Sequence, residues 1–167
     1  QLKRQHKIDI ADVAKMEVSI PPKRYARHYS AEVKTGLRGK FAINYVVAMC
    51  FLDGKLEIAT FTDEKVNEPK VQDAFSKVQV ICDESIPEPG PYCPVSVELK
   101  DGTRHSYTAK IAKGDPRNPM TEEEVTEKFR GNARQAISQK QTEAVVDAVK
   151  RIESVDNVKT IVNLLKP

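Results

Sequence analysis

The chain has 167 residues, with 27 Lys and Arg against 24 Asp and Glu, and it is 40% apolar and 6% aromatic. This apolar content excludes a disordered chain and fits one soluble globular domain with room for an appendage. No apolar run approaches the roughly 20 residues that a membrane span needs, and a net charge of +3 is too small by itself to indicate a nucleic-acid groove.

The start of the chain is unusual for a complete protein. It begins with Gln1 instead of Met, and residues 2–7 have the pattern of a helix already under way. No secretory apolar core follows. We therefore expect a piece of a longer protein.

The cysteine and histidine patterns favour no metal site. These residues are Cys50, Cys82, Cys93, His6, His28 and His105. The odd number of cysteines and the wide spacing of all six residues fit neither a disulfide framework nor a zinc site. We therefore expect no metal and no organic cofactor. Reduced thiols without a signal peptide favour the cytoplasm.

The first predicted strand covers residues 16–20, where Met16, Val18 and Ile20 alternate with polar side chains. Two prolines end it. Residues 23–39 are basic and without periodicity, which predicts a solvated loop.

Residues 41–52 (FAINYVVAMCFL) predict a buried helix, because they are apolar on nearly all sides and longer than a typical strand. Asn44 is the one strongly polar interruption, and Asp53 and Gly54 end the helix. Within this run Cys50 is expected to be a small buried hydrophobic residue.

The middle of the chain alternates short elements. Residues 62–76 predict short helices broken near Pro69, and residues 77–80 predict a second strand. Three prolines within residues 86–91 exclude regular structure there.

A hairpin follows. Residues 95–99 alternate, Asp101 and Gly102 form a turn signal, and residues 104–111 are extended in character. With four or so strands mixed with helices and no regular βαβ alternation, the fold class is α+β. We expect a mainly antiparallel sheet of about four strands packed with helices.

The C-terminal part predicts amphipathic helices. A capping box at Thr121 and Glu124 starts a helix that we expect to end near Gly131 and Asn132. From residue 133 onward apolar residues recur at helical spacing. This apolar face needs a partner.

Three residues are candidates for chemistry. Arg38 and Lys40 stand just before the predicted buried helix, where unpaired N–H groups and positive charge favour a carboxylate or phosphate. The simpler alternative is that both side chains only keep the helix entrance solvated. Tyr45, inside the helix, is either a hydrogen-bonded buried phenol or an acid or base tuned by its site.

A competing interpretation uses the same segment. Gly36 and Gly39 match the Gly-x-x-Gly loop of KH modules, which clamps a nucleic-acid backbone ahead of a helix. Neither the apolar residues expected before that loop nor an aromatic stacking platform is present, so this non-catalytic RNA- or anion-binding module is the alternative.

Two groups of motifs resemble the MmgE/PrpD family, which includes 2-methylcitrate dehydratases, cis-aconitate decarboxylases and iminodisuccinate epimerases. The first is TGLRGKFAINYVVA at residues 35–48, followed by LDG at 52–54. The second is the order LKDG, KGDPRNP and EKFR between residues 99 and 130. Residues 10–18 are also similar to the family. Ala42 replaces the Ser of the family motif, and Val33 stands where Pro is common.

The resemblance implies a two-domain lyase or isomerase with its active site between a large helical domain and a smaller α+β domain. Residues 1–116 would be the small domain, and residues 117–167 a helical segment that packs on the missing N-terminal helical domain. Tyr45 matches a family active-site position. Lys40 matches the motif Lys, with a catalytic or substrate-contacting role, and Arg38 would bind substrate with it.

These observations predict a chain that is inactive alone and acts within a longer enzyme on a small di- or tricarboxylate. We expect a homodimer of the complete protein, and neither nucleic acid nor membrane as a partner. A third possibility is a regulatory or structural protein that keeps the fold without catalysis, which separate orientations of Arg38, Lys40 and Tyr45 would favour.

Overall fold

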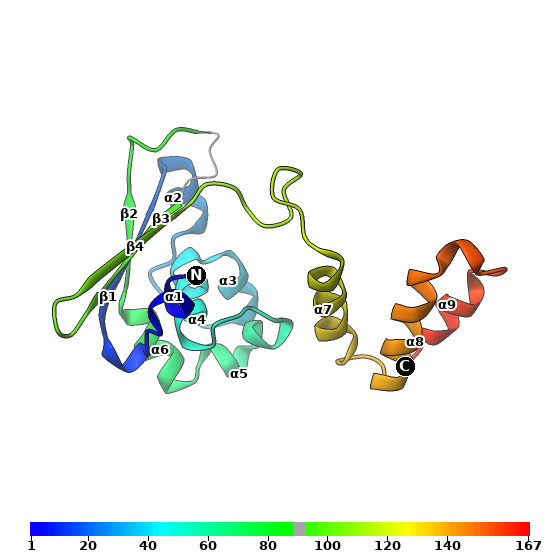
Figure 1. Ribbon diagram of the computed structural model, residues 1–167. Helices are drawn as coiled ribbons and strands as arrows, with labels where there is room; N and C mark the ends of the chain where they lie inside the picture. Colours follow the sequence, from blue (N-terminus) through cyan, green and yellow to red (C-terminus); the bar gives the residue numbers. More distant parts are fainter. Residues whose placement is uncertain (89–92) are drawn as a thin grey trace. The chain divides into compact units, whose positions relative to one another are not determined.

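The computed structural model describes residues 1–88 and 93–167 (Figure 1). The chain divides into two compact units, residues 1–112 and residues 113–167. Each unit is described by itself below. Part of the proline-rich segment expected to be irregular, residues 89–91, lies outside the described residues, and residues 86–88 form no helix or strand.

The first unit contains a four-stranded sheet in the order β2-β1-β3-β4. Its strands are β1 (Val13–Ile20), β2 (Val78–Cys82), β3 (Cys93–Leu99) and β4 (Arg104–Ala109). The expected α+β class is confirmed, and so is the hairpin at Asp101 and Gly102, where Gly102 takes a φ of 87°. The pairs β1–β3 and β3–β4 are antiparallel.

The β1–β2 pair is parallel, so the sheet is mixed and not simply antiparallel. The cause is the connection, because the chain crosses from β1 to β2 through a series of helices and enters β2 in the same direction. These helical segments are α2 (Pro22–His28), α3 (Gly36–Phe41), α4 (Ile43–Leu52), η2 (Ile58–Phe61), α5 (Asp63–Val66) and α6 (Pro69–Ser76). Two more segments, α1 (Leu2–His6) and η1 (Ile10–Asp12), precede β1.

Residues 23–39 are not the continuous loop that their charge suggested. Pro22 starts α2, where a missing N–H costs nothing, and Thr35 caps α3 by accepting from Arg38 N. The buried helix begins at Ile43, because the backbone of Ala42 is extended and interrupts the helical geometry. Phe41 therefore belongs to α3.

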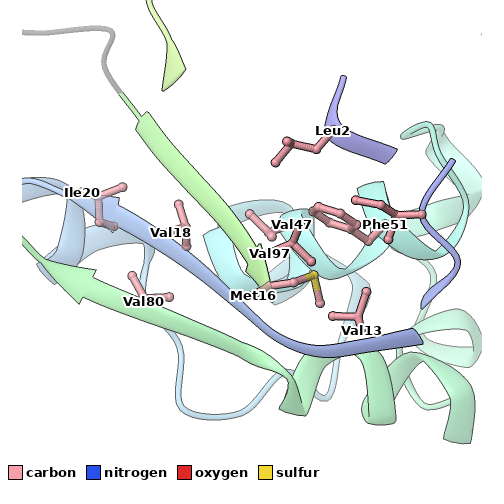
Figure 2. Close-up of a cluster of buried hydrophobic side chains, with 10 residues drawn as sticks. Leu2, Val13, Met16, Val18, Ile20, Val47, Phe51, Val80 and Val97 are labelled. Atoms are coloured by element: carbon pink, nitrogen blue, oxygen red, sulfur yellow. The ribbon is translucent and has the colours of Figure 1, made fainter. Parts of the chain in front are cut away.

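The main core lies between the sheet and α4 (Figure 2). Val13, Met16 and Val18 of β1 are fully buried against Val47 and Phe51 of α4. The alternating residues of β1 on the other face include Lys15 and Glu17, which form an ion pair of 2.6 Å. Alternation along β1 therefore separates a core face from a polar face, as the sequence predicts.

A second buried cluster lies on the other side of α4. It consists of Val33, Ala42, Tyr45, Met49, Val66 and Val71. Coverage by both clusters explains why α4 is apolar on most sides. The expectation that Cys50 is buried is wrong. Cys50 is exposed, on the part of α4 that neither cluster covers.

The second unit consists of helices. They are α7 (Glu122–Ala133), α8 (Gln139–Lys150), η3 (Ile152–Ser154) and α9 (Lys159–Leu164). The capping box of Thr121 and Glu124 forms as expected, but α7 continues through Gly131 and Asn132 to Ala133. Arg130 of α7 binds Glu143 of α8 at 2.7 Å and ties the two helices together.

In the part of the chain that the structure describes, no helix has the length and hydrophobicity required to cross a membrane.

Candidate functional site

The candidate site is built on α3, the short helix that carries Arg38 and Lys40. Thr35 Oγ1 accepts from Arg38 N at 3.2 Å, and Gly36 N donates to Asp63 Oδ1 at 2.7 Å. Two of the first N–H groups of α3, those of Gly36 and Arg38, are thus already bonded within the protein. The sequence placed the expected anion site at the start of the buried helix, which is α4, and the N-cap of that helix, Ala42, makes no side-chain cap bond. At α3 any attraction for an anion comes from side chains.

The two glycines of α3 are explained by close packing. A Cβ on Gly36 would lie 1.9 Å from the carbonyl oxygen of Phe61, and a Cβ on Gly39 would lie 3.0 Å from the ring of Tyr45. Gly36 therefore lets α3 approach the backbone of η2. The Gly-x-x-Gly residues thus belong to a packed helix and not to a loop, which does not favour the KH-like interpretation.

Tyr45 lies directly beneath α3. Its side chain is fully buried, and its hydroxyl donates to the carbonyl oxygen of Thr60 at 2.6 Å. Burial, followed by the charges of Asp53 and Glu68, raises the pKa of Tyr45 to about 12. The phenol is therefore protonated at neutral pH, and its proton is engaged by a buried carbonyl.

Arg38 is held against the segment that follows α2. Its Nε donates to Ser30 Oγ at 2.9 Å, and its Nη2 donates to the carbonyl oxygen of Tyr29 at 2.9 Å. These bonds fix the guanidinium although the residue remains exposed. Arg38 is thus a preorganised positive charge with donors left for a ligand.

Lys40 is exposed to solvent on the same helix. Within residues 1–88 and 93–167 no group contacts its ammonium. Two large apolar side chains of α3 are exposed as well, Leu37 at 68% and Phe41 at 54%. The surface of α3 therefore combines a cation without a partner and uncovered apolar area, which is typical of a binding surface.

Asn44 and Ser30 support Arg38, and the sequence interpretation gave neither a role. Asn44 Nδ2 donates to the carbonyl oxygen of Ser30 at 2.8 Å, and Asn44 is 3% exposed. Its Oδ1 is buried without a hydrogen-bond partner among the described residues. The signal that could have found Asn44 was its polarity within an apolar helix, since buried amides must be bonded.

The structure does not bring the three predicted site residues together. The guanidinium of Arg38 is bonded to Tyr29 and Ser30, Lys40 is exposed to solvent, and Tyr45 is in the core. Tyr45 touches the other two only indirectly, by supporting the helix that carries them.

No cluster of three or more His, Cys, Asp or Glu side chains suited to a metal ion occurs among the described residues. The surface of α3 presents two cations on a short helix, with apolar area beside them, and can attract an anion electrostatically.

Comparison with known proteins identifies the chain's relatives. Residues 1–153 match the family model of the MmgE/PrpD C-terminal domain. The chain belongs to the MmgE/PrpD family. The resemblance carried by residues 35–54 and 99–130 is thereby confirmed, and the match covers the whole first unit and most of the second.

Two curated family members are similar over much of the chain. Cis-aconitate decarboxylase of Mus musculus is 27% identical over 159 residues, which cover 92% of this chain and 32% of that protein. Cis-aconitate decarboxylase of Homo sapiens is 31% identical over 132 residues, which cover 76% of this chain and 27% of that protein. The chain thus spans about a third of the length of the curated relatives it matches.

Proposed function

We propose that this chain is the C-terminal part of a lyase that acts on a small di- or tricarboxylate, and that its reaction is the decarboxylation of cis-aconitate. The observation that carries this proposal is the similarity to cis-aconitate decarboxylase over 92% of the chain. The cationic surface of α3 supports it, because a polycarboxylate needs positive partners.

In this proposal Arg38 and Lys40 bind substrate carboxylates. Loss of CO2 leaves negative charge on the substrate, and fixed cations near that charge lower the barrier. Arg38 is held in place before substrate arrives. The ammonium of Lys40 has no contact among the described residues, so it breaks none of them when it binds a carboxylate. A proton must then be donated to carbon.

Tyr45 has the role of a positioning residue in this proposal. Its ring supports Gly39, and its hydroxyl anchors Thr60, so it holds α3 against η2. The alternative role, an acid or base that reacts with substrate, requires the phenol to leave Thr60. A Tyr45→Phe variant separates the two: a positioning role raises KM and leaves the pH profile of kcat unchanged, whereas an acid or base role removes one limb of that profile.

The remainder of the site is proposed to come from an N-terminal helical domain in a cytoplasmic homodimer. One face of the second unit suits such a neighbour. A groove of about 470 Å³ lies between α7 and α8, lined mainly by Val125, Phe129, Val145, Val146 and Val149. Val125 and Val149 are each 53% exposed, an apolar surface that a further domain would cover.

The test is an assay of the protein that the complete gene encodes, with NMR detection of products from cis-aconitate, 2-methylcitrate and iminodisuccinate. We expect decarboxylation of cis-aconitate to dominate. Faster conversion of either other substrate would overturn the proposed reaction but keep the lyase or isomerase class. A folded protein that converts none of them would overturn the enzyme proposal. The 167-residue chain alone should be inactive, and turnover by it at roughly 1 s⁻¹ or faster would contradict the need for a further domain.

The Lys40→Ala variant tests the site itself. We expect kcat/KM to fall by about 10- to 100-fold, because a charge-assisted contact to a carboxylate is lost. Lys70→Ala is the matched control, since Lys70 is an exposed lysine of α6 whose side chain is 64% exposed. Equal activity of the two variants would remove Lys40 from the site.

A second candidate function is a non-catalytic role of the same fold. The separate placement of Arg38, Lys40 and Tyr45 favours it. A complete protein that binds tricarboxylates, yet converts none of the three substrates, would support this role.

A further inference from the structure

Helix α2 carries a group of basic side chains that the proposed reaction does not use. Lys23, Arg24, Arg27 and His28, here called the α2 basic cluster, line a hollow of about 370 Å³ together with Glu88. The hollow is large enough for a small molecule with several charged groups and is lined mostly by cationic groups.

The positive excess of the chain is concentrated around this cluster. Residues 23–40 contain six Lys or Arg and one acidic residue, Glu32. The rest of the chain has 21 basic and 23 acidic residues. The net charge of +3 therefore hides a local field that attracts anions.

The arrangement within α2 is unfavourable for the helix itself. Lys23 and Arg27 are four residues apart on one face, so two positive groups are neighbours on the helix surface. Lys23 and Arg24 also lie in the first turn, where the helix dipole disfavours cations. Among the described residues that line the hollow, Glu88 is acidic and lies 3.7 Å from Lys23. A bound anion would relieve this repulsion.

His28 lines the hollow and is held in place by α3. Its Nδ1 lies 3.3 Å from the carbonyl oxygen of Phe41, and because a carbonyl only accepts, Nδ1 carries the hydrogen. The bond fixes the ring and leaves Nε2 for a second partner. His28 is half-buried, so it forms a wall of the hollow and not a freely moving side chain.

We propose that the α2 basic cluster binds a small polyanion of the phosphate type. Guanidinium groups match phosphate oxygens in paired hydrogen bonds, and a lysine beside them suits a ligand with more than one negative charge. The cluster adjoins α3 through His28 Nδ1 and the carbonyl oxygen of Phe41, but it consists of other residues and does not rest on the proposed decarboxylation.

The experiment titrates the 167-residue chain with inorganic pyrophosphate by calorimetry and by amide NMR shifts, at about 20 mM and about 150 mM NaCl. We expect sub-millimolar binding at the lower salt, weaker binding at the higher salt, and shifts centred on residues 22–28. Citrate is titrated in parallel, which separates phosphate chemistry from a tricarboxylate of similar charge.

The double variant Lys23→Ala with Arg27→Ala should weaken pyrophosphate binding by at least about 10-fold. Lys128→Ala with Lys140→Ala removes the same charge from exposed positions of α7 and α8 and should leave binding unchanged. Both double variants replace exposed side chains, and their circular dichroism spectra verify folding.

Three results would overturn the proposal. The first is no pyrophosphate binding below about 10 mM, and the second is equal loss of affinity in the two double variants. The third is citrate binding at residues 22–28 that is tighter than pyrophosphate binding, which would assign the cluster to carboxylates.

Discussion

At the scale of single residues, Tyr45 combines burial with a strong hydrogen bond. Its fully buried hydroxyl lies 2.6 Å from Thr60 O, and its pKa is raised to about 12 because burial opposes the charged phenolate. A buried carbonyl and a buried phenol that satisfy each other stabilise the contact between α4 and η2. This contact has consequences for stability that can be measured without substrate.

The Tyr45→Phe variant should be less stable than the natural chain by about 1 to 3 kcal/mol at pH 7, because Thr60 O loses its partner. The difference should shrink as the pH rises from 10 to 12. Between these values the unfolded chain releases the phenol proton and the folded chain retains it. The free energy of unfolding of the natural protein therefore falls by about 2 to 3 kcal/mol, a loss that the variant, which has no phenol at this position, does not undergo.

Urea unfolding followed by circular dichroism at pH 8, 10 and 11 measures both effects, since the chain has no Trp. Comparison with the variant cancels the titration of the other tyrosines and of the lysines. A stability difference that stays constant to pH 11 would show that Tyr45 releases its proton as readily in the folded chain as in the unfolded one, which contradicts a pKa raised by burial.

At the scale of elements, alternation and turn chemistry predicted the four strands and the hairpin. Val13–Ile20 is longer than the alternating residues 16–20 suggest, because pairing with β3 continues to Val13. Local sequence patterns also predicted the helices within residues 62–76 and the capping box at Thr121, and the structure contains both. Local patterns therefore sufficed wherever an element is determined by its own side chains.

Long-range contacts decided the features that local patterns did not predict. α3 forms because Gly36 fits against η2, a contact that joins residues 25 positions apart. Asn44 supports Arg38 through Ser30, and the parallel β1–β2 pair depends on the path of the intervening helices. The sequence nominated Arg38, Lys40 and Tyr45 but could not show that they lie in different environments.

Two glycine substitutions test the packing of the helices. Gly36→Ala should destabilise the first unit by at least about 2 kcal/mol, because its Cβ would lie 1.9 Å from a backbone oxygen that cannot move alone. Gly131→Ala is the matched control in α7, where nothing lies within 4 Å of the added Cβ. It should stabilise the chain by about 0.5 to 1 kcal/mol through helix propensity.

Urea midpoints of the two variants, measured side by side, decide this prediction. Because both changes add the same methyl group to a helix, a difference in sign isolates the contact with η2. If Gly36→Ala were as stable as the natural chain, close approach would not be the reason for this glycine.

At the scale of the whole molecule, the buried apolar residues are unevenly divided. Both core clusters consist of residues of the first unit. In the second unit the described buried apolar side chains are Ile137, Val145, Val146 and Ile161. Many of its other apolar residues are well exposed: Val125, Val149, Ile152, Val158, Val162 and Leu165. Such a small unit with so little buried area is expected to be marginal by itself.

Separate expression of residues 1–112 and 113–167 tests this difference. The first fragment should unfold cooperatively in urea, because it retains both cores, and the second should lose helix gradually without a sharp transition. Hydrogen exchange by NMR should show protected amides in β1 and α4 of the first fragment and little protection in α7–α9 of the second. A cooperative transition of the second fragment would mean that α7, α8 and α9 form a sufficient core, and that their exposed apolar face needs no further domain.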